Sequence, residues 1–219
     1  MRIPVDIHTH QQPQVPGEAI VNCFPETFVP QAEGWYSVGI HPWYITSSVA
    51  SAVGFVLNNR TMHFEELLRH PRVLAVGEAG LDKLAEAPLT LQMEVFEYQA
   101  RLAEEVDKPL IIHLVRAVDE LLKLKLKIRP VKPWIIHGFR GKAALAEEYL
   151  RHGFYLSFGE KYQEEALRIV PPKRLFIETD ESTTPVGLLY ERAAEIRETP
   201  LEELRETIRR NVGEIFFRQ

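Results

Sequence analysis

Histidine and carboxylate side chains stand at the ends of short apolar segments in this sequence, and the first of them are two histidines near the start. The opening reads Val5-Asp6-Ile7-His8-Thr9-His10. In a β-strand, residues two apart point to the same face, so Asp6, His8 and His10 would share one side. Two imidazoles at this spacing can hold one divalent metal ion, but the pair alone fits two surface histidines after a strand equally well.

Further histidines and carboxylates end or follow other apolar segments of the chain: His41, Glu78, His113, His137 and Asp180. Any one of these could be structural, but together they offer more donors than one four-coordinate ion needs. Imidazole mixed with carboxylate suits zinc, manganese or iron better than calcium. Two ions bridged by a carboxylate could lower the pKa of a bound water and stabilise the attacking and leaving oxygens. This chemistry favours the hydrolysis of phosphate esters, amides or esters.

The elements that would position these residues are eight strand-like segments, most of them separated by helical patterns. The predicted strands are Ile3–Ile7, Ala19–Phe24, Tyr36–Ile40, Val73–Glu78, Leu110–His113, Trp134–His137, Phe154–Phe158 and Arg174–Thr179. The predicted helices are Met62–Arg69, Leu89–Val106, Val118–Lys127, Lys142–Arg151, Lys161–Ile169, Leu188–Arg197 and Leu201–Phe217. Alternation of this kind indicates parallel βαβ units.

Eight such units predict an α/β fold, a (β/α)₈ TIM-type barrel. The alternative, an open doubly wound sheet, is weakened because no glycine-rich phosphate loop follows any strand. The stretches after the first two strands are short and rich in proline, so the first two crossover helices are expected to be shortened or missing. In such a barrel the carboxyl ends of all strands meet at one mouth, which would bring the candidate ligands together.

Length and composition predict one domain over residues 1–219, because 45% of the residues are hydrophobic. The net charge of -5 argues against a protein that grips nucleic acid without specificity. A single cysteine, Cys23, excludes an internal disulfide and points to a reducing cytoplasm. The first strand begins close to Met1, so we expect no signal peptide, and no apolar run reaches the length of a membrane span.

The motifs around these residues resemble one family. They are Asp-Ile-His-Thr-His at 6–10, Val-Gly-Ile-His-Pro-Trp at 38–43, Val-Gly-Glu-Ala-Gly-Leu-Asp at 76–82, Pro-Leu-Ile-Ile-His-Leu-Val-Arg-Ala at 109–117, Ile-Ile-His-Gly-Phe-Arg-Gly at 135–141, Glu-Thr-Asp at 178–180 and Arg-Asn-Val-Gly-Glu-Ile-Phe at 210–216. In this order they resemble the TatD-type metal-dependent deoxyribonucleases and hydrolases of the amidohydrolase superfamily.

The resemblance implies a site with two divalent metal ions (Zn, Mn, Mg or Fe). The first ion would be held by His8, His10, Glu78 and Asp180. The second would be held by Glu78, His113 and His137, with Glu78 bridging. Asp180 would also orient or deprotonate the attacking water, so Asp180 and Glu78 are the expected catalytic residues.

Three further residues are candidates for binding substrate. By the resemblance, Arg116 would contact a phosphate and His41 would lie near the substrate. Arg140 stands where the family often has a different residue and would add positive charge at the mouth. Trp43 could either stack on a base or pack at the rim.

The expected activity is hydrolysis of phosphodiester bonds, from DNA ends, by water that two metals activate. The front of the chain and the segment after Asp82 are shorter than usual in the family, and both belong to the mouth. The alternatives are therefore a hydrolase of a small ester, amide or phosphomonoester, or a metal-binding module without turnover. The expected partners are DNA or a small phosphoester substrate, with no membrane and no protein partner, and the expected state is a monomer.

Overall fold

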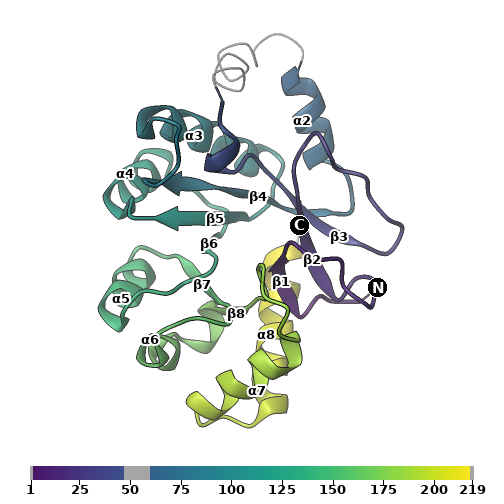
Figure 1. Cartoon of the computed structure of the whole chain (residues 1–219), viewed down its shortest axis with the longest axis vertical. Helices are drawn as coiled ribbons and strands as arrows, with labels where there is room; N and C mark the ends of the chain where they lie inside the picture. The colour runs from purple at the N-terminus through teal and green to yellow at the C-terminus, as the bar shows by residue number, and fades with distance from the viewer. Residues whose placement is uncertain (1, 47–59, 218–219) are drawn as a thin grey trace. The chain divides into compact units, whose positions relative to one another are not determined.

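Parallel strands run in sequence order in this protein, and a computed structural model describes residues 2–46 and 60–217 (Figure 1). The strands, in the order β1 to β8, are Asp6–Thr9, Ala19–Cys23, Trp35–Val38, Val73–Asp82, Leu110–Val115, Trp134–Ile136, Tyr155–Phe158 and Leu175–Ile177. After β8, Asp180 forms a parallel bridge with Thr9, so the segment that follows the last strand pairs with the first strand, β1. This order confirms the predicted (β/α)₈ TIM-type fold.

The helices follow the predicted pattern to within a few residues. They are α2 (Arg60–Leu68), α3 (Leu89–Glu105), α4 (Val118–Ile128), α5 (Ala143–Arg151), α6 (Glu164–Ile169), α7 (Val186–Ile196) and α8 (Leu201–Phe216), with short 3₁₀ helices η1 (Pro42–Tyr44) and η3 (Pro172–Arg174). Within the described ranges, no helix is both long and apolar enough to cross a membrane.

The connections after β1 and β2 contain no helix, as predicted. Residues 10–18 and 24–34, all of which the structure describes, form turns and extended segments. Prolines at positions 13, 16, 25 and 30 interrupt both stretches, and proline lacks the N–H that a helix interior needs.

Two strands, β1 and β4, differ most from the predicted bounds, and the others differ by one or two residues at an end. Strand β4 continues past Glu78 to Asp82, because it stays paired with β5 up to the pair Asp82 and Val115. All ten of its residues are buried, which is typical of a parallel strand covered on both faces. Strand β1 starts at Asp6 and not at Ile3, and Pro4, which cannot donate to a strand ladder, lies in the part that was predicted to be strand.

The chain divides into two compact units, which are considered separately. The first comprises Met1–Val21, Gln31–Trp35 and Ile135–Gln219. In it, β7 pairs with β8, and α8 packs on both β8 and its neighbour α7 (Figure 1). Phe154, Phe158, Phe176 and Tyr190 are among its large, fully buried side chains.

The second unit comprises Asn22–Pro30 and Tyr36–Trp134. Its centre is the long pairing of β4 with β5, on which α3 packs, with α4 beside α3 (Figure 1). The rings of Phe96 and Trp134 meet edge to face at 5.3 Å between centroids, which fixes α3 in its place. In both units the candidate ligands lie in these strands or shortly after them.

A buried lysine holds the loop before β4. Lys108 is 4% exposed, and its ammonium donates to the main-chain oxygens of Leu68, His70 and Val73. Lys108→Met would leave these oxygens without that donor, so we expect the free energy of unfolding to fall by about 3 kcal/mol.

Chemical denaturation of Lys108→Met measures this loss. Lys127→Met is the matched control, because Lys127 is 61% exposed in an ion pair with Glu97, which is expected to contribute about 0–1 kcal/mol. Equal losses in the two variants would contradict the assigned role of Lys108.

Candidate metal centre

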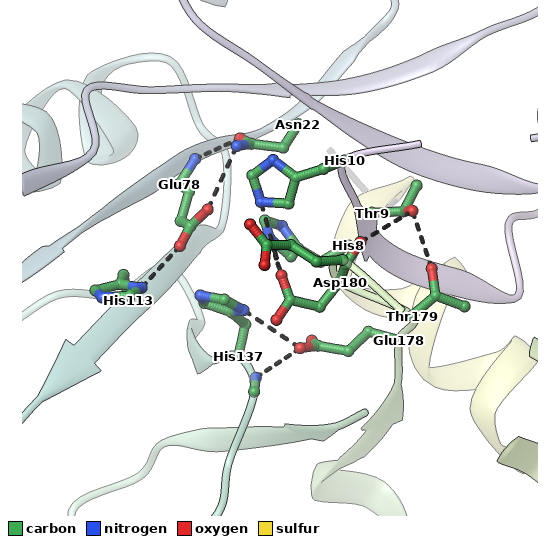
Figure 2. Close-up of polar contacts among 12 residues, drawn as sticks. His8, Thr9, His10, Asn22, Glu78, His113, His137, Glu178, Thr179 and Asp180 are labelled. Atoms are coloured by element: carbon green, nitrogen blue, oxygen red, sulfur yellow. Dashed lines mark hydrogen bonds and ion pairs between the residues drawn. The ribbon is translucent and has the colours of Figure 1, made fainter. Parts of the chain in front are cut away.

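The first unit gathers three histidines around one carboxylate. His8 lies in β1 and is fully buried, His10 follows that strand, His137 follows β6, and Asp180 follows β8. Asp180 Oδ1 lies 3.8 Å from His8 Nε2 and 3.7 Å from His10 Nε2. One donor atom each of His8, His137 and Asp180 lie within 4.8 Å of one another. We call these four residues the β1 group, and Figure 2 shows their side chains turned toward each other.

The main chain around Asp180 is attached to β1 at two points. The Asp180 N–H donates to the His8 carbonyl oxygen at 2.9 Å, and the His10 N–H donates to the Asp180 carbonyl oxygen at 3.0 Å. Asp180 has a φ of 57°, in the left-handed region that residues other than glycine rarely occupy. Backbone strain of this kind persists where surrounding contacts over-determine it, and it is found at functional sites.

Two buried carboxylates support the β1 group. Glu178 Oε1 accepts the Gly138 N–H at 2.6 Å and lies 3.2 Å from His137 Nδ1 (Figure 2). Asp6 accepts hydrogen bonds from the Thr179 N–H and hydroxyl and from the His8 N–H. These contacts give each of the two carboxylates a positioning role.

The pKa values of these two carboxyls shift in opposite directions, although burial acts to raise both. Burial raises the pKa of Asp6 to about 7, although the hydrogen bonds from Thr179 favour the ionised form. Burial would also raise the pKa of Glu178, but the charge and hydrogen bond of His137 outweigh it and lower that pKa. An ionised Glu178 holds the proton of His137 on Nδ1, so that Nε2 carries the lone pair that a metal needs.

Replacing Glu178 should weaken metal binding through His137. Glu178→Met removes the acceptor at nearly constant volume, and we expect the affinity for a divalent ion to fall by about 10–100-fold. Competition with a chromophoric chelator measures the affinity. Glu178→Gln keeps an oxygen acceptor and should lose less, whereas equal losses in the two variants would contradict a role through the hydrogen bond.

A small cavity adjoins the β1 group. Its volume is about 320 Å³, and Asp180, Glu178, Arg140 and Lys161 are among the residues that line it. The Arg140 guanidinium is 62% exposed and lies 3.8 Å from Asp180 Oδ2. The cavity therefore places the cation of Arg140 beside the Asp180 carboxylate, and Glu160 and Glu181 line it as well.

The second unit holds another group of possible ligands. Glu78 of β4 is 3% exposed, and its Oε1 lies 2.9 Å from His113 Nδ1 and 3.2 Å from His41 Nε2. One donor atom of each of the three residues lies within 4.8 Å of the others. We call His41, Glu78 and His113 the β4 group.

Close approach of β5 to β4 brings His113 to Glu78. A Cβ at Gly80 would lie 1.9 Å from the His113 main-chain oxygen, so only glycine permits this spacing. His113 lies opposite Gly80 in the parallel register. The glycine between Glu78 and Asp82 thus allows the imidazole to reach both carboxylates.

Three residues beside the β4 group were not predicted as contacts. Asn22 of β2 accepts the Glu78 N–H at 2.8 Å and donates to Glu78 Oε2 at 3.4 Å (Figure 2). Asp82 Oδ2 lies 3.2 Å from His113 Nε2 and accepts the Trp43 indole N–H at 2.6 Å. A polar residue inside an apolar strand was the available signal for Asn22, and the even spacing from Glu78 was the signal for Asp82.

Hydrogen bonds keep Asp82 ionised. Burial would raise the pKa of this carboxyl, but hydrogen bonds from the Leu84 N–H, the Trp43 indole and His113 outweigh burial and lower it. Its main chain is also fixed, because the Gln92 side-chain amide accepts the Asp82 N–H and donates to the Asp82 carbonyl oxygen. Asp82 is thus a rigid anion next to His113.

Comparison with known proteins decides what kind of centre this is. The profile of the family described as "TatD related DNase" matches residues 29–217. The chain belongs to this family. It is 34% identical over 174 residues to the "Uncharacterized metal-dependent hydrolase YabD" of Bacillus subtilis. The aligned residues are 69% of this chain and 68% of that protein.

Two further TatD relatives extend the comparison. The "3'-5' RNA nuclease TATDN2" of Homo sapiens is 30% identical over 173 residues, which are 74% of this chain and 22% of that protein. The crystal structure of YJJV, a TatD homologue from Escherichia coli, matches 100% of both chains with a TM-score of 0.75 at 20% identity. The similarity to TATDN2 agrees with membership of the family, and the similarity to the YJJV structure supports the fold.

Membership of the TatD family makes this chain a metal-dependent hydrolase, so the expected enzyme class is confirmed. The matched residues begin at position 29, after His8 and His10, and these two are placed only by the geometry of the β1 group. Divalent metal binding is supported by the relatives' names and by both donor groups. Arg116, the remaining predicted residue, is exposed and follows β5 with a φ of 56°.

Proposed function

We propose that this TatD-family protein hydrolyses phosphodiester bonds of nucleic acid, working inward from DNA ends. The observation that carries the proposal is two sets of two imidazoles and one carboxylate, whose donor atoms lie within 4.8 Å of one another in each set. The sets are His8, His137 and Asp180 of the β1 group, and His41, Glu78 and His113 of the β4 group. The family description names DNase activity, and the human relative is named a 3'-5' RNA nuclease. These names support a nucleic-acid substrate for this chain.

The donor sets fit two divalent ions, one in each group. His8, His10, His137 and Asp180 would hold the first, and Glu78 and His113, with His41 beside them, would hold the second. Mixed nitrogen and oxygen donors fit zinc, manganese or iron better than magnesium. When bound, the ions would lower the pKa of water and neutralise charge on the phosphodiester.

The residues of the chain would supply positioning and proton transfer. Asp180 would accept the proton of the attacking water, because its carboxylate lines the cavity and its main chain is attached to β1. Arg140 and the exposed Arg116 would bind phosphate oxygens. Glu178 and Asp82 would orient His137 and His113.

Digestion of a 5'-labelled single-stranded oligonucleotide tests this function. The protein is reconstituted separately with zinc, manganese or magnesium, and metal content is measured in each sample. We expect stepwise shortening that a chelator stops and that added metal restores. Intact oligonucleotide in the presence of protein with bound metal would overturn the nuclease proposal.

A small ester, amide or phosphomonoester is the second candidate substrate class. Residues 10–18 and 24–34 contain no helix, so these connections offer little structure to hold a long substrate. The cavity of about 320 Å³ is also modest, which suits a small substrate. Chromogenic phosphomonoesters and carboxylic esters, measured beside the oligonucleotide, separate the two classes. Turnover of these compounds alone would select the second candidate.

We also propose a cytoplasmic monomer in which residues 1–219 form one domain. The single cysteine and the negative net charge of -5 support a reducing compartment and little non-specific association. Light scattering measures the mass, which is 25.2 kDa for one chain. A single cooperative unfolding transition would support one domain.

A further inference from the structure

One tryptophan of this protein is exposed beside the β4 group. Trp35 and Trp134 are 2% and 0% exposed, whereas Trp43 is 65% exposed. Trp43 lies in η1, directly after His41 and Pro42. Packing in the core accounts for a buried tryptophan, but it does not account for the exposed ring of Trp43.

Two buried side chains hold this exposed ring in one orientation. His41 Nδ1 accepts the Trp43 main-chain N–H at 3.1 Å, which caps η1. Asp82 Oδ2 accepts the indole N–H at 2.6 Å. His41 is 7% exposed and Asp82 is 1% exposed, so both anchors are themselves rigid. A ring fixed before binding loses little conformational freedom when a ligand packs on it.

The fixed ring is close to the expected reaction site. Its centroid lies 5.6 Å from that of His41 and 6.5 Å from that of His113. Because Asp82 already accepts the indole N–H, the ring offers a ligand its π face. A nucleobase is the planar group that lies a few bonds from a phosphodiester, and stacking on an aromatic face tolerates every base.

We propose that Trp43 is the stacking platform for the nucleobase beside the hydrolysed phosphodiester. This inference rests on the proposed nuclease function and deepens it, since it names a residue that separates nucleic acid from simple phosphoesters. His41 and Asp82 position the platform, and both also contact the β4 group. Binding of the base and placement of the phosphate are thereby linked through the same side chains.

Tryptophan fluorescence tests the contact directly. Zinc-loaded full-length protein is titrated with phosphorothioate-linked oligothymidylate and, separately, with the same strand bearing an abasic terminal residue. We expect the normal strand to quench the emission of Trp43 and the abasic strand, which lacks the stacking base, to leave it nearly unchanged. The quenching can be assigned to Trp43 because Trp35 and Trp134 are buried. Calorimetry on the same samples reports binding independently.

Kinetics with two variants tests its contribution to substrate choice. Trp43→Leu should raise KM for the normal oligonucleotide by roughly 10–100-fold, the range expected for one stacked base, and should change KM little for the abasic strand. Trp43→Phe retains a ring and should lie between Trp43→Leu and wild type. A merely structural role would instead lower kcat equally on both strands.

The two readouts separate failure of this inference from failure of the proposed function. Cleavage of the oligonucleotide without quenching, or equal kinetics for normal and abasic strands in every variant, would overturn the stacking role and leave the nuclease function standing. Quenching by the normal strand without cleavage would support the stacking role and overturn the nuclease function. Neither binding nor cleavage would overturn both.

Discussion

Asp180→Asn is expected to lower kcat for phosphodiester hydrolysis by about 10³-fold, within the range that removal of a general base produces. The substitution keeps the size of the side chain but removes the charge and the proton acceptor that face His8, His10 and Arg140. Asparagine tolerates the left-handed φ of 57° better than most residues, so the backbone should be retained. Steady-state kinetics and near-ultraviolet circular dichroism measure the two effects.

Glu191→Gln is the matched control for Asp180→Asn. Glu191 lies in α7 and is exposed, so its replacement removes one negative charge away from the β1 group and from the cavity that Asp180 lines. We expect its kcat to remain within about twofold of wild type, as is usual for a surface change. If Asp180→Asn retained a tenth or more of the wild-type kcat, Asp180 would not be the proton acceptor.

Glu78→Gln is expected to remove about one metal equivalent per chain and to lower kcat by about 10³-fold, because a metal-assisted step loses several kcal/mol of charge stabilisation. Glu78 is the carboxylate of the β4 group, 3% exposed and in contact with His41 and His113. A neutral amide is a poor ligand for these ions. Elemental analysis of the purified protein gives the metal content, and oligonucleotide digestion gives the rate.

The control for Glu78→Gln is Glu86→Gln, an exposed change in the segment that follows β4. It should keep both the metal content and the rate of wild type. Unchanged metal content in Glu78→Gln with a large loss of rate would show that Glu78 acts on the substrate and not as a ligand. Unchanged rate would exclude Glu78 from the site altogether.

The order of strands and helices could be predicted from the sequence because it depends on local patterns of apolar and polar residues. Apolar segments bounded by proline, glycine or charged residues predicted every strand, and the helices α3 to α8 were placed to within a few residues. The loss of the first two crossover helices was also predicted, since proline acts on its own local backbone. The bounds of β1 and β4 were wrong because pairing with a neighbouring strand decides where a strand ends.

The same holds for the site: the candidate residues could be chosen from the local sequence, but the contacts that hold them could not. The residue types and their positions after strands sufficed to choose these side chains as candidates, because strand alternation and the parallel fold direct them. Their grouping differs from the prediction: His137 was expected with Glu78 and His113 but lies with His8 and Asp180, and His41, expected near the substrate, lies beside Glu78. The hydrogen bonds that support these ligands from residues far apart in sequence were not predicted. Asn22 lies 56 residues from Glu78, and Trp43 lies 39 residues from Asp82.

The sequence by itself therefore determined the fold class, the family and the set of candidate metal ligands. Only the tertiary structure decided how those ligands are held: Asn22 on Glu78, Asp82 between His113 and Trp43, and Glu178 on His137. The physical reason is that a hydrogen bond between strands depends on their register and spacing to within a fraction of an ångström. Gly80 fixes that spacing for β4 and β5, and its effect becomes visible only when the two strands are placed side by side.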